Sequence, residues 1–214
     1  MTSAQTIPGP RHKFTVEEYL VLERAAEERH EFFDGEIVAM AGEKLNHGII
    51  SANIVASLGN QLKGTPCFVL TKDTKVRSGL GVASSRLTKG MFSYPDVLVV
   101  CGEPECFDEH RDIIMNPAAT VEVLSQSTEL FDRGQKFRRY RNWNPSLKDY
   151  VLVDQTQPLV EHFRRDADAG WTMQEAVGLE ASMTFSGVPC VLKLADVYDR
   201  IKFDEESSEE GLES

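Results

Sequence analysis

Residues 118–125, AATVEVLS, and residues 149–154, DYVLVD, enclose a segment with helical periodicity from about residue 128 to residue 142. The two flanking runs are short and almost continuously apolar, as is typical of strands buried on both faces of a sheet. Strand, helix and strand in this order predict one βαβ crossover within a mixed sheet. We therefore expect an α/β (α+β) fold in which helices flank a central mixed β-sheet.

The segments before this unit supply more strands and two further helices. YPDVLVVC (94–101) predicts another buried strand, and HEFFDGEIVAMAG (30–42) predicts two short strands joined by an Asp-Gly turn. A Thr-x-x-Glu capping box predicts a helix over about residues 15–28. Apolar residues at helical spacing predict a second helix over about residues 47–63, with Asn46 as its cap.

Weaker patterns complete the expected order of elements. They predict a strand over 67–76 that leads into a Gly- and Ser-rich loop at 78–90, a hairpin over 159–177, and a strand with a closing helix over 184–201. The four cysteines show neither a C-x-x-C pair nor the spacing of a zinc site, so we expect buried thiols at Cys67, Cys101, Cys106 and Cys190.

Length and composition predict one domain over 14–203, between a flexible N-terminal lead over 1–13 and an acidic disordered tail over 204–214. The N-terminus lacks the apolar core of a signal peptide, and no apolar run approaches the length of a membrane span, so we expect a cytoplasmic protein with no membrane partner. The formal net charge is −11. Because an acidic protein is a poor nonspecific nucleic-acid binder, this charge argues against a simple DNA-binding module. Any DNA site must be a local basic patch assisted by metal ions.

Two carboxylates occupy unusual places in the predicted sheet. Asp96 opens one apolar strand and Glu122 lies inside another. A buried carboxylate needs a cation, hydrogen bonds or a shifted pKa, and one shared divalent ion would serve both side chains. Oxygen ligands of this kind favour Mg²⁺ or Mn²⁺. The alternative is structural: Asp96 caps a turn after Pro95, and Glu122 pairs with an arginine.

The helix after Glu122 carries a candidate catalytic cation. Asp132, Lys136 and Tyr140 are spaced four residues apart and so share one helix face. A lysine directed at the carboxylates can orient an attacking water or stabilise the charge that develops on a phosphate. The same segment is the densest positive run of the chain, although a solvated helix face explains that run equally well.

The ordered set of these motifs resembles the Uma-type restriction endonucleases of the PD-(D/E)XK nuclease superfamily. The resemblance runs through HEFFDGEIVAMAG, NHGIISANIVASL, YPDVLVV, ATVEVLSQST, the D-x-x-x-K-x-x-x-Y pattern and DYVLVD, and it covers roughly residues 15–200. It implies a restriction-endonuclease-like core, with Asp96 and Glu122 holding the metal and Lys136 as the catalytic lysine. The superfamily's usual E-x-K lysine is replaced here by Leu124, and the resembled family supplies the lysine from the following helix.

The resemblance also marks secondary candidates. Glu36 corresponds to an early acidic position and is expected either as a third metal or water ligand or as a surface turn residue. His47 is a candidate substrate contact or proton carrier, with helix capping as the alternative. The other candidate substrate-binding residues are Gln126, Tyr140, Arg133 and Arg139. A competing D-x-K pair, Asp73 and Lys75, lacks a buried acidic strand before it.

Two functional hypotheses of different classes follow. The first is an Mg²⁺-dependent endonuclease that hydrolyses DNA phosphodiester bonds and that can pair as a homodimer to cut both strands. The second is a catalytically inactive nuclease-fold protein that serves as a binding or regulatory module. A different hydrolase finds no support, since the sequence contains no G-x-S-x-G, P-loop or H-E-x-x-H motif.

Overall fold

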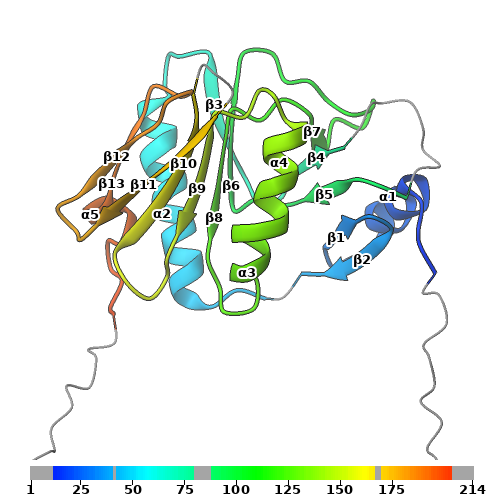
Figure 1. Cartoon of the computed structure of the whole chain (residues 1–214), viewed down its shortest axis with the longest axis horizontal. Coiled ribbons are helices and arrows are strands. Elements are labelled where there is room, and N and C mark those ends of the chain that lie inside the picture. Colours follow the sequence, from blue (N-terminus) through cyan, green and yellow to red (C-terminus); the bar gives the residue numbers. More distant parts are fainter. Residues whose placement is uncertain (1–11, 41, 80–87, 167–169, 204–214) are drawn as a thin grey trace, which may run out of the picture.

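The computed structural model describes residues 12–40, 42–79, 88–166 and 170–203 (Figure 1). The acidic tail and all but two residues of the N-terminal lead lie outside the described residues, as does most of the predicted Gly- and Ser-rich loop. Among the described residues, no helix is both long and apolar enough to cross a membrane.

The main sheet has six strands and is mixed. Its order is β11 (Trp171–Val177), β10 (Leu159–Arg165), β9 (Asp149–Val153), β8 (Ala119–Val123), β6 (Val97–Cys101) and β3 (Cys67–Thr71). β8 and β9 are parallel, and the helical segment between them forms the predicted βαβ crossover, whereas the other neighbours in this sheet are antiparallel. The predicted mixed sheet and its strand–helix–strand unit are confirmed.

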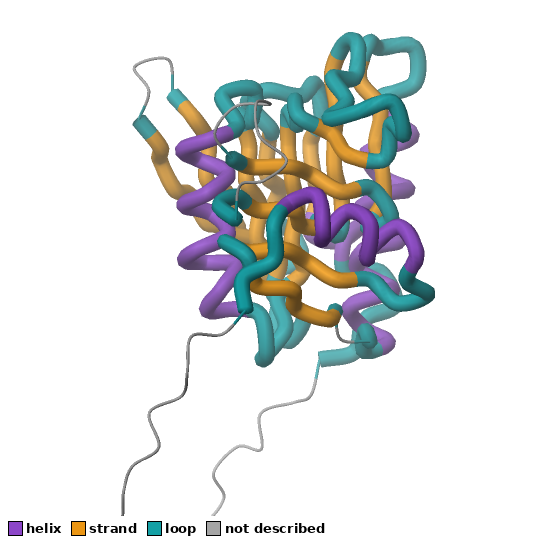
Figure 2. The backbone as a smooth tube through the Cα atoms, turned by 90° about the vertical axis from the view of Figure 1, so that its right-hand side faces the viewer, coloured by secondary structure: helices purple, strands orange, loops and turns teal. Residues whose placement is uncertain are grey.

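A second sheet of five strands is an addition to the expected architecture. Its order is β2 (Glu36–Ala39), β1 (His30–Phe33), β5 (Met91–Ser93), β4 (Lys75–Ser78) and β7 (Ile113–Ile114). In Figure 2 its strands run across in front of the more upright strands of the main sheet. The single strand predicted over 67–76 is wrong, because a turn closed by the Thr74 amide on the Thr71 carbonyl splits it between the two sheets.

The predicted Asp-Gly turn joins β1 and β2 and is confirmed. Asp34 and Gly35 both have positive φ, 47° and 91°, which this hairpin turn requires. A Cβ on Gly35 would also lie only 2.8 Å from the Cβ of Lys13. The chain therefore uses glycine here both for backbone conformation and for space.

The first two helices match the prediction with one correction. α1 (Val16–Ala25) starts with the predicted capping box of Thr15 and Glu18. α2 (Leu45–Gln61) begins earlier than expected: Lys44 is its cap residue without a side-chain hydrogen bond, and Asn46 lies inside the first turn, so the predicted Asn46 cap is wrong. The buried side of α2 packs on the face of the main sheet formed by Val97, Val99, Val121 and their neighbours.

The opposite face of the main sheet is covered by the crossover segment and by the second sheet. This segment consists of α3 (Glu129–Phe131), a π-helical turn (Asp132–Lys136) and α4 (Phe137–Trp143). Tyr140 and residues of β4 and β5 pack there against Leu98 and Leu152 of the main sheet. At the C-terminus, β12 (Ser182–Thr184) and β13 (Val191–Lys193) form a hairpin before α5 (Leu194–Val197), which lies against α2 (Figure 1).

A disulfide between Cys67 and Cys101 corrects the expectation of four thiols. The two cysteines are direct partners in the antiparallel pairing of β3 with β6, 34 residues apart in sequence. Only the strand register brings them together, and spacing along the chain does not reveal it. Cys106 and Cys190 are free.

Loss of this disulfide is expected to destabilise the oxidised protein. Closing a loop of this length limits the unfolded chain, so Cys101→Ser should lower the free energy of unfolding by about 2–4 kcal/mol, measured by urea titration. Cys106→Ser, which removes a free thiol, is the matched control and should change it by less than about 1 kcal/mol. Four reactive thiols in the denatured protein before any reduction would contradict the pairing.

Candidate active site

Asp96 lies immediately before β6, and Glu122 lies on the neighbouring strand β8. β6 and β8 are antiparallel with Val97 opposite Val121, so the next position in register sets Asp96 opposite Glu122. Asp96 Oδ2 also accepts a hydrogen bond of 2.7 Å from the backbone amide of Val123. The strand pairing therefore brings together two carboxylates that are 26 positions apart in the sequence.

Lys136 reaches this pair from the helical segment above β8. Its Nζ lies 2.8 Å from Glu122 Oε2, 3.5 Å from Asp132 Oδ1 and 3.5 Å from Glu31 Oε1. Lys136 and Glu122 are only 4% and 3% exposed. One ammonium is thus enclosed by three carboxylates; these four residues are called the lysine cluster below.

Glu31 is the member of the lysine cluster that the sequence did not predict. It lies on β1, and its Oε1 accepts a hydrogen bond of 3.0 Å from the backbone amide of Tyr94. The predicted hairpin acid, Glu36, instead lies exposed on β2 opposite Phe33. Glu31 directly precedes the buried Phe32 in an otherwise aromatic strand, and that placement of a charge was the available signal.

The lysine cluster contains three carboxylates and one ammonium, and it is largely shielded from water. Burial raises the pKa of Glu122 well above its ordinary 4.5, and the charges of Asp132 and Asp96 add to this, while Lys136 opposes it. Burial alone would lower the pKa of Lys136, but Glu122, Glu31 and Asp132 outweigh it and raise that pKa. The surplus negative charge favours a bound proton or an added cation.

The hydrogen bonding of Glu122 favours an added cation over a bound proton. Oε2 accepts from Lys136, but Oε1 is buried and has no hydrogen-bond partner among the described residues. The buried Asp149 shows the opposite arrangement: it accepts from His162, from the amide and hydroxyl of Ser186 and from the amide of Gly187. Burial would raise the pKa of Asp149, yet these bonds lower it. Asp149 is satisfied by the fold, whereas Glu122 retains a free ligand atom.

His47 joins the site through Asp96. Its Nε2 lies 2.9 Å from Asp96 Oδ1, so the first turn of α2 contacts the start of β6. Glu43, just before α2, lies beside them, with the ligand atoms of all three residues within 4.8 Å of one another. Glu43 was not predicted from the sequence, and its carboxylate is also paired with Lys72. Among the described residues, Glu43, His47 and Asp96 form the group whose ligand atoms lie close enough together to share one metal ion, and Glu122 is not part of that group.

The predicted basic contacts are mostly paired with carboxylates. Arg139 forms two hydrogen bonds with Asp34, of 3.1 and 2.7 Å, and Arg133 contacts both Glu129 and Glu161. Internal ion pairs therefore occupy the guanidinium groups of both candidate arginines, Arg133 and Arg139.

The remaining candidates lie in different environments. Tyr140 is fully buried with its hydroxyl 2.9 Å from Ser93, and Gln126 is exposed after β8. The competing D-x-K pair forms no site of its own, because Asp73 contacts Arg29 and Lys75 contacts Asp112. Leu124, at the usual E-x-K lysine position, is buried in the core, so a lysine cannot approach Glu122 from that position without displacing apolar packing.

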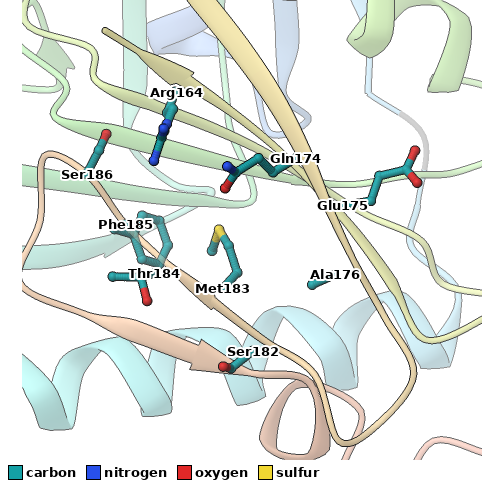
Figure 3. Close-up of a pocket in the computed structure, with 9 residues that line it drawn as sticks. All are labelled: Arg164, Gln174, Glu175, Ala176, Ser182, Met183, Thr184, Phe185 and Ser186. Carbon is teal, nitrogen blue, oxygen red and sulfur yellow. The ribbon is translucent and has the colours of Figure 1, made fainter. Parts of the chain in front are cut away.

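A hollow of about 280 Å³ lies elsewhere, between the β10–β11 hairpin and β12 (Figure 3). Its lining includes Arg164, Gln174 and Met183 and no member of the lysine cluster. Arg164 is engaged there with Thr172 and Asp166. The lysine cluster therefore lies outside this hollow.

The mixed sheet, its flanking helices and the carboxylate–lysine geometry define a restriction-endonuclease-like fold. The chain belongs to the Uma2 family, described as "Putative restriction endonuclease", which it matches over residues 16–195. This confirms the family resemblance drawn from the ordered motifs.

Individual relatives agree with this membership. The chain is 36% identical to "Uncharacterized protein slr1290" of Synechocystis sp. over 78% of this chain and 83% of that protein. It is 35% identical to "Uncharacterized protein sll1609" of the same organism over 80% of this chain and 92% of that protein. A crystal structure from Anabaena variabilis, described as a "putative nuclease belonging to DUF820", has a TM-score of 0.70 and 15% identity, covering 88% of this chain and 99% of that one. At this identity the structural likeness establishes the fold.

Proposed function

We propose that this protein is a metal-dependent endonuclease that hydrolyses DNA phosphodiester bonds. The observation that carries the proposal is Glu122: a buried carboxylate with one oxygen on Lys136, the other oxygen without a hydrogen-bond partner among the described residues, and the charge of Asp96 near enough to raise its pKa. Membership of a family described as "Putative restriction endonuclease" supports the same reaction.

Asp96 and Glu122 would hold Mg²⁺ or Mn²⁺, which supplies a Lewis acid for the phosphate and lowers the pKa of bound water. Lys136, held by Glu122, would direct its ammonium at the charge that develops on the phosphate oxygens. Glu31 and Asp132 keep that ammonium protonated and in place. His47 contacts Asp96 Oδ1 and would orient this carboxylate.

The alternative, an inactive nuclease-fold binding module, is favoured by two observations. Leu124 occupies the usual lysine position, and both Arg133 and Arg139 are neutralised by carboxylates. The position of Lys136 weighs against the argument from Leu124, since the crossover segment supplies an ammonium 2.8 Å from Glu122. A divalent ion held by the carboxylates would supply positive charge for the phosphate and so would reduce the need for free arginines.

The test is incubation of supercoiled plasmid with purified protein and Mg²⁺ or Mn²⁺, with EDTA as the control. We expect nicked or linear DNA that depends on the metal. Linear product without a nicked intermediate would indicate two sites acting together, as in a homodimer, and nicked product first would indicate separate cuts. No metal-dependent cutting of plasmid, single-stranded or structured DNA would favour the binding module.

A further inference from the structure

One turn of the segment that carries Lys136 is not α-helical. Asp132–Lys136 forms a π-turn between α3 and α4. Such a turn contains one more residue than an α-turn and is frequent at functional sites. Lys136 is its last residue, with the ammonium 2.8 Å from Glu122. The geometry of this turn therefore sets where the ammonium lies.

Tyr150 contacts the first residue of the π-turn and the residue that follows the turn. It is fully buried on β9, and its hydroxyl donates a hydrogen bond of 2.9 Å to the carbonyl oxygen of Asp132, the first residue of the turn. Its ring stacks on Phe137, the residue just after the turn, with ring centroids 5.0 Å apart and planes 25° from parallel.

The strand that carries Tyr150 is hydrogen-bonded to the strand that carries Glu122. In the parallel pairing of β8 with β9, Leu152 lies opposite Glu122, and Tyr150 lies two residues before Leu152 on the same face. Tyr150, which contacts the π-turn, and Glu122, which pairs with Lys136, therefore lie on neighbouring strands of the main sheet.

We propose that Tyr150 is a positioning residue, whose hydroxyl holds the π-turn in the geometry that places Lys136 on Glu122. Tyr150 acts through the backbone of Asp132 and does not itself contact substrate. The catalytic half of this inference rests on the proposed endonuclease function, whereas its structural half does not.

Tyr150→Phe tests the inference, because it removes the hydroxyl and keeps the ring. Tyr198→Phe is the matched control: that hydroxyl is also buried and also donates to backbone carbonyls, those of Asp154 and Leu159, away from the lysine cluster. The Tyr198 hydroxyl also accepts a hydrogen bond from the Leu159 amide, so Tyr198→Phe removes at least as many bonds as Tyr150→Phe and a general loss of stability should be at least as large in it.

The first measurement is amide hydrogen exchange by NMR across residues 134–137 of the full-length protein. In Tyr150→Phe we expect exchange about fivefold to tenfold faster than in wild type, from loss of one buried hydrogen bond, with little change in Tyr198→Phe. Equal exchange in the two variants would overturn the inference.

The second measurement is plasmid cleavage with Mn²⁺ under the same conditions. We expect Tyr150→Phe to lower kcat by about tenfold with KM for DNA unchanged, since Lys136 is displaced but DNA contacts are not. Faster exchange with an unchanged kcat would overturn the positioning role. If the wild-type protein cuts no DNA, the proposed function fails, and the exchange comparison alone decides whether Tyr150 holds the turn.

Discussion

Glu122→Gln is expected to reduce plasmid cleavage by on the order of 10³-fold or more. The amide has the shape of the carboxylate, but it lacks the negative charge that would bind a divalent ion and hold Lys136. Titration calorimetry with Mn²⁺ should show weaker binding in the absence of DNA. Because an amide buried among three charged groups replaces a carboxylate with a raised pKa, the fold should remain intact in far-UV circular dichroism.

Glu161→Gln is the matched control for this substitution. Glu161 lies on β10, is also largely shielded from solvent, and pairs with Arg133 outside the lysine cluster. Its loss should leave cleavage within about threefold of wild type, as expected for an ion pair away from the reacting groups. Equal activity of Glu122→Gln and wild type would remove Glu122 from the mechanism, and with it the observation on which the endonuclease proposal rests.

Lys136→Met is expected to abolish cleavage and also to lower the free energy of unfolding by about 3–5 kcal/mol at neutral pH. Methionine retains the length of the side chain but not its charge, so Glu122, Glu31 and Asp132 are left near one another without their shared cation. Urea unfolding monitored by tryptophan fluorescence measures the stability.

The destabilisation by Lys136→Met should grow as the pH rises. The pKa of Glu122 is raised in the folded protein, and removing Lys136 raises it further because Lys136 is what opposes the shift. The folded state then binds more protons than the unfolded state above the ordinary carboxyl pKa of 4.5, so stability falls as the pH rises through this window. The variant should therefore be closer to wild type at pH 5 than at pH 8.

Lys75→Met is the matched control for Lys136→Met, because it removes a buried lysine outside the lysine cluster and so separates a loss of stability from a loss of cleavage. Lys75 is also buried, and it contacts Asp112 and the Tyr94 hydroxyl. Its replacement should lower stability while leaving cleavage by the folded protein near the wild-type rate. A Lys136→Met protein that is as stable as wild type at pH 8 would contradict the charge balance described for the lysine cluster.

The sequence by itself determined the local elements and the chemistry of the site. The capping box at Thr15, the Asp34-Gly35 turn and the apolar runs around Asp96 and Glu122 each depend on short-range preferences of backbone and side chain. Carboxylates in apolar strands stood out without any knowledge of their partners. The order of the motifs then led to the family that the chain matches.

Only the tertiary structure decided which groups meet. It separated β3 from β4 into different sheets, joined Cys67 to Cys101, and selected Glu31 rather than Glu36 for the lysine cluster. Arg133 and Arg139 also acquired carboxylate partners that are distant in the sequence, Glu161 on β10 and Asp34 in the turn between β1 and β2.

The physical reason is that these outcomes depend on strand register and on long-range packing. A register shift of one residue reverses the face to which every side chain of a strand points, and no local pattern records which strand will be the neighbour. The π-turn at Asp132–Lys136 is a further example, because the sequence spacing predicts an ordinary helix there. Local preference therefore determines which residues have the required chemistry, and long-range packing determines which of them share one site.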